Sequence, residues 1–196
     1  DVKHMNNLVQ TLLKFATASG NPGVLNIELV RVDEILMRLP GDMQRQDKEY
    51  SVSLKFPELP EQEEKLLLLG NEDLLLTAVR NIVSNACKYS ADHNADVALE
   101  LNDHTFRIDI TDKGIGIEEK ELMNIFQPFY RVEDSRTFKG FGLGLSLANR
   151  IIKLHNGNIT VSSIPGAGTT FSIELPVKAD KNAPVNNGDR MHTGAL

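Results

Sequence analysis

The chain has 196 residues, enough for one well-buried domain with short extensions and too few for two full domains. Hydrophobic residues make up 41% and charged residues 24%, which is ordinary for a soluble globular protein. The formal net charge of −6 argues against a nucleic-acid binder, because a phosphate backbone needs a basic surface. The single cysteine, Cys87, excludes an internal disulfide and favours a reducing, cytoplasmic setting.

The N-terminal part of the chain predicts a helix, an extended segment and a second helix. Residues 4–18 carry apolar positions at helical spacing, and residues 25–32 are expected to be extended. The second helix is predicted to begin near Asp33 and to be weakened at its end by Pro40 and Gly41. No apolar run is long enough to span a membrane, and because the chain begins without methionine we expect a piece of a longer protein.

The rest of the chain is predicted to interleave strands and helices. Asn71 or Asp73 can cap a long helix that ends near Tyr89. The other predicted elements are strands over 50–56, 66–69, 97–101, 105–111, 159–163 and 169–175, helices over 118–126 and 143–155, a loop over 127–141 and a disordered tail over 178–196. Because no regular βαβ rhythm appears, they predict an α+β fold, a two-layer sandwich with helices on one face of a mixed, mostly antiparallel sheet.

The first polar motif lies on the long predicted helix. Asn81, Asn85 and Lys88 are spaced by four and three residues, so they share one helical face. Two carboxamides and an ammonium group on such a face could hold a metal ion and phosphates. Taken alone, the motif is explained better by a solvated helix face.

The second motif follows a predicted strand. Ile108 and Ile110 alternate toward the core, and Asp112 continues that alternation at the end of the strand. A buried carboxylate needs a hydrogen-bond partner, and an adenine amino group is one candidate. Gly114 and Gly116 would let a ligand approach the backbone closely. A tight turn that contains an aspartate explains this motif equally well when it is taken alone.

Two further motifs come later in the chain. Residues 126–129 combine aromatic side chains with a proline, which predicts either a core plug or the anchor of a mobile loop, and Arg131 beside them could meet a phosphate. Gly140, Gly142 and Gly144 precede a helix, where free N–H groups can bind phosphate. The cluster lacks the Lys-Ser/Thr ending of a P-loop and follows no βαβ strand, so neither a P-loop nor a dinucleotide fold is predicted.

In this order, the motifs resemble those of the ATP-binding domain of sensor histidine kinases, in the superfamily shared with gyrase, heat-shock chaperones and MutL. Residues 81–90 are similar to its N box, 112–116 to its G1 box, 126–129 to its F box and 140–144 to its G2 box. The resemblance covers roughly residues 30–177. It implies a Bergerat-type ATP-binding fold and an ATP-dependent protein histidine kinase with ATP and Mg²⁺ as cofactors.

The resemblance assigns a role to each matching residue. Asn85 would ligate Mg²⁺ with support from Asn81, and Lys88 would approach the phosphates. Asp112 would accept a hydrogen bond from the adenine amino group, and Gly116 would pass close to the base. The other implied nucleotide contacts are Tyr89, Gly114, Ile117, Phe126, Arg131, Gly140, Phe141, Gly142, Leu143, Gly144 and Leu145, and residues 127–141 would form a lid over ATP.

Asn81 also bears on the kind of reaction. The ATP-hydrolysing relatives usually carry glutamate at this position to activate water, and an amide cannot act as a base, so the resemblance favours a kinase over a hydrolase. Phe141 departs from the Ser or Thr that the family often has there, which loses any hydroxyl contact. Two alternatives stay open, a nucleotide-binding module without catalysis and a serine kinase or ATPase of the same fold.

The phosphoaccepting histidine of such a kinase stands on a dimeric helical hairpin, and none of the five histidines here is followed by the expected residues. His155 is predicted to be structural, at a helix C-terminus where positive charge is favourable.

The expected layout is the end of the hairpin's second helix over 1–19, a linker over 20–29, the catalytic domain over 30–177 and a tail over 178–196. The implied partners are the hairpin of its own or a partner subunit and a response regulator receiver domain. The parent protein is expected to be a homodimer with this domain in the cytoplasm. The fragment, with half of the hairpin missing, could be monomeric, and anchoring of the parent in the inner membrane is left open.

Overall fold

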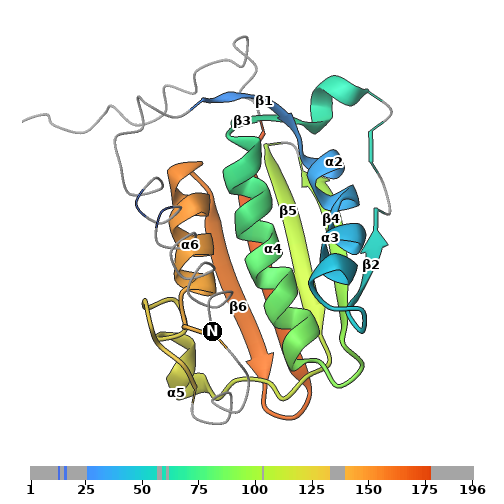
Figure 1. The fold of residues 1–196 in the computed structure, drawn as a ribbon. Helices are drawn as coiled ribbons and strands as arrows, with labels where there is room; N and C mark the ends of the chain where they lie inside the picture. The colour runs from blue at the N-terminus through green and yellow to red at the C-terminus, as the bar shows by residue number, and fades with distance from the viewer. Residues whose placement is uncertain are drawn as a thin grey trace, which may run out of the picture.

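One layer of the protein is a five-stranded sheet (Figure 1). The computed structural model describes Leu13, Ala16 and residues 26–56, 59–60, 62–102, 104–132 and 140–177. The strands lie in the order β2 (Ser51–Lys55), β4 (Asn94–Asn102), β5 (Thr105–Asp112), β7 (Gly168–Pro176) and β6 (Asn158–Ile164). β2 pairs with β4 in parallel, and the other neighbouring pairs are antiparallel. The predicted mixed, mostly antiparallel sheet is therefore confirmed.

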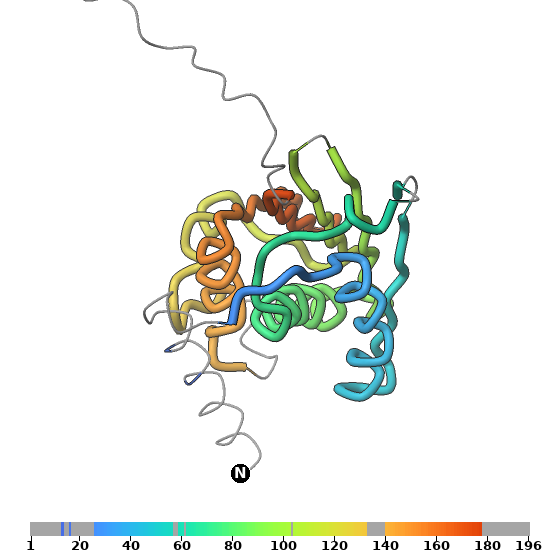
Figure 2. The backbone as a smooth tube through the Cα atoms, turned by 90° about the horizontal axis from the view of Figure 1, so that it is seen from above, coloured from blue at the N-terminus to red at the C-terminus, as the bar shows by residue number. Residues whose placement is uncertain are grey.

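Helices cover one face of this sheet, as the view from above shows (Figure 2). They are α2 (Val32–Met37), α3 (Leu39–Gln46), α4 (Glu72–Tyr89) and α6 (Gly144–Leu154). α4 contacts β2, β4 and β5, α6 contacts β6, and the two helices pack against each other. This arrangement confirms the predicted α+β fold with two layers. In the part of the chain that the structure describes, no helix has both the length and the apolar character needed to cross a membrane.

A separate two-stranded ribbon lies across the start of α4 (Figure 1). It pairs β1 (Glu28–Arg31) with β3 (Leu67–Gly70) in antiparallel register. The extended segment predicted over 25–32 is confirmed at Glu28–Arg31, whereas Val32 begins α2 and residue 25 lies outside the described residues. The strand predicted over 66–69 is confirmed except that Leu66 ends the 3₁₀ turn η2 (Glu63–Leu66).

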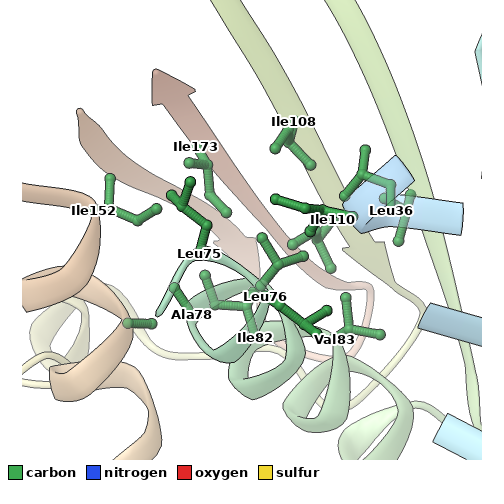
Figure 3. Packing of buried hydrophobic residues seen from close by; sticks show 14 of the residues in the cluster. Leu36, Leu75, Leu76, Ala78, Ile82, Val83, Ile108, Ile110, Ile152 and Ile173 are labelled. Atoms are coloured by element: carbon green, nitrogen blue, oxygen red, sulfur yellow. The ribbon is translucent and has the colours of Figure 1, made fainter. Parts of the chain in front are cut away.

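The sheet and the helices enclose an apolar core (Figure 3). Figure 3 shows Ile108 and Ile110 of β5 and Ile173 of β7 turned toward Leu75 and Ile82 of α4. All five side chains are almost completely buried. Burying an aliphatic side chain of this size contributes roughly 1.5–3 kcal/mol. The packing therefore holds the apolar face of α4 against the sheet. The polar face of the helix, which carries Asn81, Asn85 and Lys88, is turned away from this core.

The start of α4 lies where the sequence predicts it, whereas the junction between α2 and α3 does not. Asn71 caps α4 as predicted, because its Oδ1 accepts a hydrogen bond from Leu74 N at 3.0 Å. The predicted weakening at Pro40 is wrong. The chain leaves α2 at Arg38 and continues at once as α3, with Pro40 in the first turn. A proline in a first turn lacks only an N–H that would have no helical partner, so it starts a helix.

Three further predictions concern the shorter or undescribed segments. The helix predicted over 118–126 is reduced to α5 (Glu119–Leu122), and turns follow it. Asn124 N donates to Glu121 O at 2.8 Å and Gln127 N donates to Asn124 O at 2.8 Å, a three-residue spacing that ends the α-helix. The predicted N-terminal helix, apart from Leu13 and Ala16, and the tail from residue 178 lie outside the described residues.

His155 joins the end of α6 to the start of α4. Its Nδ1 lies 2.7 Å from Ile151 O, and Asn71 N donates to its Nε2 at 2.9 Å. A carbonyl needs a donor and an amide needs an acceptor, so the ring is neutral with its proton on Nδ1. Burial lowers the pKa of His155, which agrees with this assignment. His155 is structural as predicted, but the positive charge expected at the helix end is absent from it.

We expect the protein to lose stability as the pH falls below about 6.5, because the unfolded chain then takes up a proton at residue 155 that the folded chain resists. The full contribution of the neutral ring is present above that pH, and the loss is complete once the pH is below the lowered folded-state pKa. Urea unfolding at about pH 7.5 and about pH 5.5 would measure this loss. His155→Gln should cost about 1–2 kcal/mol near pH 7.5 and should show a smaller pH dependence than the wild type. An equal pH dependence in both proteins would contradict the assignment.

Candidate functional site

A cavity of about 880 Å³ is bordered by α4, the loop after β5 and the start of α6. Its lining contains every predicted site residue except Gly114 and Phe126. These residues are Asn81, Asn85, Lys88, Tyr89, Asp112, Gly116, Ile117, Arg131, Gly140, Phe141, Gly142, Leu143, Gly144 and Leu145. The fold therefore brings side chains and backbone from separate motifs to the wall of one cavity.

Asp112 is the buried carboxylate of this cavity. It is 6% exposed and stands at the end of β5, where the alternation of the strand turns it toward the core as predicted. Gly114 N donates to its Oδ1 at 2.8 Å. Burial raises the pKa of Asp112, while the backbone N–H groups of Gly114 and Thr169 act in the opposite direction. A carboxylate has about four lone-pair sites, so it keeps acceptor capacity for a ligand.

The loop after β5 passes close to neighbouring backbone. A Cβ on Gly116 would lie 2.2 Å from Ile164 O, and the φ of +70° at this residue favours glycine. A Cβ on Gly114 would lie 2.2 Å from Tyr89 O. Gly114 therefore packs against the end of α4 instead of lining the cavity.

Phe126, the other predicted residue outside the lining, packs behind the wall of the cavity. Its ring packs edge-on against Phe171, with the ring centroids 6.3 Å apart. Phe171 itself lines the cavity. The interpretation of Phe126 as a core plug thus describes its contacts, and any contact with a ligand would be indirect.

The polar face of α4 meets the start of α6. A Cβ on Gly144 would lie 3.2 Å from Asn81 Oδ1, and a Cβ on Gly140 would lie 3.4 Å from Lys88 Nζ. Lys88 Nζ is also 4.8 Å from the centroid of the Tyr89 ring. An amide oxygen and an ammonium group of α4 therefore each lie beside a glycine of residues 140–144 in the cavity wall.

The start of α6 has the features of an anion site. Leu143 gives the helix no side-chain cap, and the first turn contains no acidic residue. The first N–H groups of a helix lack intrahelical partners and carry the positive end of the helix dipole. Gly142, two residues before the helix, has a φ of +70°. With Lys88 nearby, this arrangement can bind a phosphate group.

The segment predicted to be a lid is described at both of its ends, and residues 133–139 lie outside the described part. Phe129 N donates to Gly142 O at 2.9 Å, so the two ends are joined by a backbone hydrogen bond. The Tyr130 hydroxyl donates to the carboxylate of Glu121 in α5. Closure of this segment over a ligand stays a prediction.

Several lining residues were missed in the sequence. Thr169 lines the cavity and stands opposite Asp112 in the β5–β7 ladder. It continues the buried alternation of Phe171 on β7, which is the same signal that identified Asp112. Gln46 and Ser84 also line the cavity, and Gln46 Nε2 donates to Ser84 Oγ at 2.6 Å. Nothing in the spacing of these two residues predicts that contact.

A sequence model of a known family matches this part of the chain. The family is described as histidine kinase-, DNA gyrase B-, and HSP90-like ATPase, and the match covers residues 70–179, more than half of the chain. The chain belongs to this ATPase family. The resemblance to the ATP-binding domain of sensor histidine kinases is thereby confirmed.

Curated relatives within the ATPase family are sensor kinases. Sensor-like histidine kinase SenX3 of Mycolicibacterium smegmatis is 40% identical over 117 residues, which is 58% of this chain and 30% of that protein. Sensor histidine kinase WalK of Bacillus subtilis is 32% identical over 186 residues, which is 92% of this chain and 30% of that protein. The chain spans about a third of the length of the curated relatives that it matches.

Solved structures of histidine kinases share this fold. The mycobacterial sensor histidine kinase MprB is 25% identical, with a TM-score of 0.67 over 77% of this chain and 99% of that chain. Full-length ShkA in complex with AMPPNP has a TM-score of 0.71 at 23% identity, over 90% of this chain and 36% of that chain. Both likenesses agree with the two-layer fold described above.

Proposed function

We propose that this chain is the ATP-binding catalytic part of a two-component sensor histidine kinase. It would transfer the γ-phosphate of ATP to a histidine on a helical hairpin of its own or a partner subunit. A response regulator receiver domain would then take the phosphate onto an aspartate. The observation that carries the proposal is the cavity shared by the buried Asp112 carboxylate and the glycine-rich start of α6.

The surroundings of Asp112 suit an adenine ring. The carboxylate can accept a hydrogen bond from the 6-amino group, and its burial makes an unmatched partner costly. Gly116 brings bare backbone to the cavity lining, because a side chain there would collide with Ile164 O, and Ile117 and Tyr89 also contribute to the lining. These groups would hold the base, while its amino edge is read by Asp112.

The start of α6 and its neighbours suit a triphosphate. Gly140, Gly142 and Gly144 can offer backbone N–H groups, and Lys88 adds a positive charge beside Gly140. Arg131 lines the same cavity from the lid side, and a guanidinium matches the geometry of a phosphate. The phosphates would therefore be bound mainly by backbone and by two cationic side chains.

Asn85 would hold Mg²⁺, with Asn81 beside it on the same face of α4. Mg²⁺ prefers oxygen ligands and is usually bound by one or two protein groups together with phosphates and waters. Within the described residues, no group of three or more His, Cys, Asp or Glu side chains could hold a metal ion. These donors fit an ion that enters with the nucleotide. When bound, Mg²⁺ would neutralise charge on the phosphate oxygens.

Asn85→Ala is expected to remove most of the Mg²⁺-dependent gain in ATP affinity, because the amide oxygen is the ligand that the chain itself supplies. The wild type should bind a non-hydrolysable ATP analogue about tenfold more tightly with Mg²⁺ than with EDTA, and Asn85→Ala should bind it about equally in both. Titration calorimetry measures both affinities. Asn102→Ala, at the exposed end of β4, is the matched control and should keep the Mg²⁺ effect. A full Mg²⁺ effect in Asn85→Ala would exclude this residue as the ligand.

The residues of the chain would position the reactants more than activate them. A neutral imidazole is already a competent nucleophile, so the γ-phosphate only has to be held in line with it. Asn81 is an amide and cannot remove a proton from water. Closure of the lid would keep water from the γ-phosphate. We therefore expect the purified chain to bind ATP and to hydrolyse it at less than roughly one turnover per minute. A phosphate-release assay measures this rate. Rapid steady hydrolysis would contradict this mechanism.

Phosphate transfer can be tested by supplying the helical hairpin of the longer protein as a separate polypeptide with labelled ATP. The expected product is phosphate that is labile in acid and stable in alkali, as a phosphorus–nitrogen bond to histidine is. Acid-stable phosphate would favour a serine kinase. Binding of ATP without any transfer would favour a module that acts by conformation alone.

The layout of the longer protein is part of the proposal. We place the end of the hairpin's second helix over residues 1–19, a linker over 20–29, the catalytic domain over 30–177 and a tail over 178–196. The match to WalK supports this layout, since it extends to 92% of the chain and beyond the range of the family model. The longer protein would be a homodimer that carries this domain in the cytoplasm and is anchored in the inner membrane.

A further inference from the structure

The turn between β6 and β7 is held against the loop that follows β5. Gly166 N donates to Ile115 O at 2.7 Å, and Ile117 N donates to Ser163 Oγ at 2.8 Å. Ser163 is partly buried, whereas the residue before it on β6, Ser162, is exposed. The side chain of Ser163 therefore joins the β6–β7 turn to the loop after β5, which contains Gly116.

The three polar contacts of Ser163 Oγ determine where its hydrogen lies. The oxygen accepts from Ile117 N at 2.8 Å, and it lies 3.0 Å from Gly168 O and 2.8 Å from Thr169 Oγ1. A carbonyl oxygen can only accept, so the one hydrogen of Ser163 must point to Gly168. The contact between the two hydroxyls then needs the hydrogen of Thr169. Thr169 therefore donates to Ser163.

This assignment decides what Thr169 can offer to a ligand. Thr169 is 5% exposed and lines the cavity. It is the partner of Asp112 in the β5–β7 ladder, so the two residues lie side by side. Because the hydrogen of Thr169 is given to Ser163, its oxygen presents only lone pairs elsewhere. The Asp112 carboxylate also presents only acceptors. Two acceptors in one wall favour a ligand edge that carries N–H donors and disfavour an edge that carries a carbonyl oxygen, because the acceptors would then stay unpaired.

We propose that Ser163 is a positioning residue that sets the base preference of the nucleotide site by acting through Thr169. The inference rests on the proposed function, since it requires a purine nucleotide in this cavity. Ser163 keeps the hydrogen of Thr169 turned away, which suits the 6-amino group of adenine. Without the Ser163 hydroxyl, Thr169 is free to donate into the cavity and to bind a 6-oxo group.

The test compares ATP with inosine triphosphate, whose base carries a 6-oxo group and an N1–H donor where adenine carries a 6-amino group and an N1 acceptor. The inference places the Thr169 hydroxyl beside position 6 of the base. Competition against a fluorescent ATP analogue gives the ratio of the two affinities, and thermal melting followed by circular dichroism shows that each variant is folded. Ser163→Ala should lower the preference for ATP about tenfold. Ser163→Thr keeps the hydroxyl and should restore the wild-type ratio. Ser162→Ala, on the exposed side of the same strand, should leave the ratio unchanged.

A purely structural role would weaken both nucleotides equally, so an unchanged ratio in folded Ser163→Ala would overturn the inference while the proposed function stands. If Ser163→Ala does not fold, Thr169→Val replaces it, because it removes the hydroxyl on which Ser163 acts. Thr169→Val should also lower the preference for ATP, and an unchanged ratio there would overturn the inference. A folded wild type that binds neither nucleotide would overturn the proposed function and this inference with it.

Discussion

We expect Asp112→Asn to lower the affinity for ATP about 100-fold. Gly114 N donates to Asp112 Oδ1 at 2.8 Å, and an asparagine would keep its oxygen on that N–H group. Its NH₂ group would then occupy the place of the second carboxylate oxygen. Two donors, this NH₂ group and the adenine amino group, would face each other where the wild type pairs a donor with an acceptor. The loss should therefore exceed that of one missing hydrogen bond.

The same substitution should leave the protein folded. Burial raises the pKa of Asp112, so the folded chain binds a proton there more readily than the unfolded chain does. Stability is then gained as the pH falls through the folded-state pKa, and the ionised carboxylate costs stability at neutral pH. An uncharged asparagine removes that cost. Asp112→Asn is expected to be at least as stable as the wild type in urea unfolding at about pH 7.5.

Asp109→Asn is the matched control for this prediction. It makes the same chemical change on the same strand, but Asp109 lies at the partly exposed positions of β5 and pairs with Arg107 Nε at 3.0 Å. We expect its affinity for ATP to stay within about twofold of the wild type. Equal affinities for Asp112→Asn and the wild type in competition with a fluorescent ATP analogue would rule out Asp112 as the base-reading residue.

Gly142→Ala should cause the second large loss, a fall in ATP affinity of roughly 30-fold or more. The residue has a φ of +70°, and a Cβ would lie 2.6 Å from Tyr130 O and 2.8 Å from the carbonyl carbon of Phe129. The neighbouring atoms are backbone, so they cannot move aside without opening the hydrogen bond from Phe129 N to Gly142 O. The two ends of the predicted lid and the start of α6 would be displaced together. Phosphate contacts and phosphate transfer should both weaken.

Gly166→Ala separates backbone strain from the clash. Gly166 has a φ of +76°, close to that of Gly142, but no atom lies within 4 Å of the Cβ that alanine would add. Both variants therefore carry a strain of about 1–2 kcal/mol, and only Gly142→Ala adds a collision. We expect Gly166→Ala to bind ATP within about threefold of the wild type. Equal losses in the two variants would mean that the clash at Gly142 is relieved without effect on the site.

The sequence predicts those parts of the site that depend on local periodicity. Alternation along one strand is enough to bury Asp112, because successive side chains of a strand point to opposite faces. Helical spacing places Asn81, Asn85 and Lys88 on one face of α4, and a side-chain cap sets the start of that helix at Asn71. Each of these inferences needs only residues that are neighbours along one element.

The predictions that were wrong or incomplete depend on how elements meet. The sequence predicts a weakened helix end at Pro40, yet the chain turns at Arg38 and the proline falls in the first turn of the next helix, where its missing N–H has no consequence. The charge expected on His155 is excluded by its burial between two helices, where one ring nitrogen has to accept from Asn71 N. Neither packing arrangement is visible in the residues on either side.

The same reason explains the missed residues of the cavity wall. Thr169 carried a usable signal, since it is a polar residue on the buried face of a predicted strand. Its significance, however, comes from its position opposite Asp112 and from its contact with Ser163. The contact between Gln46 and Ser84 joins two helices that are far apart in the chain. Such pairs follow from tertiary packing, which periodicity does not encode.

Binding of Mg²⁺-ATP in this cavity is tested most directly by titration calorimetry with a non-hydrolysable ATP analogue. The wild-type chain is titrated with and without Mg²⁺ after circular dichroism has shown that it is folded. We predict binding of one nucleotide per chain in the micromolar range, tightened by Mg²⁺, at roughly −7 to −9 kcal/mol. A folded chain that takes up no analogue under either condition would contradict the assignment of the cavity as a nucleotide site.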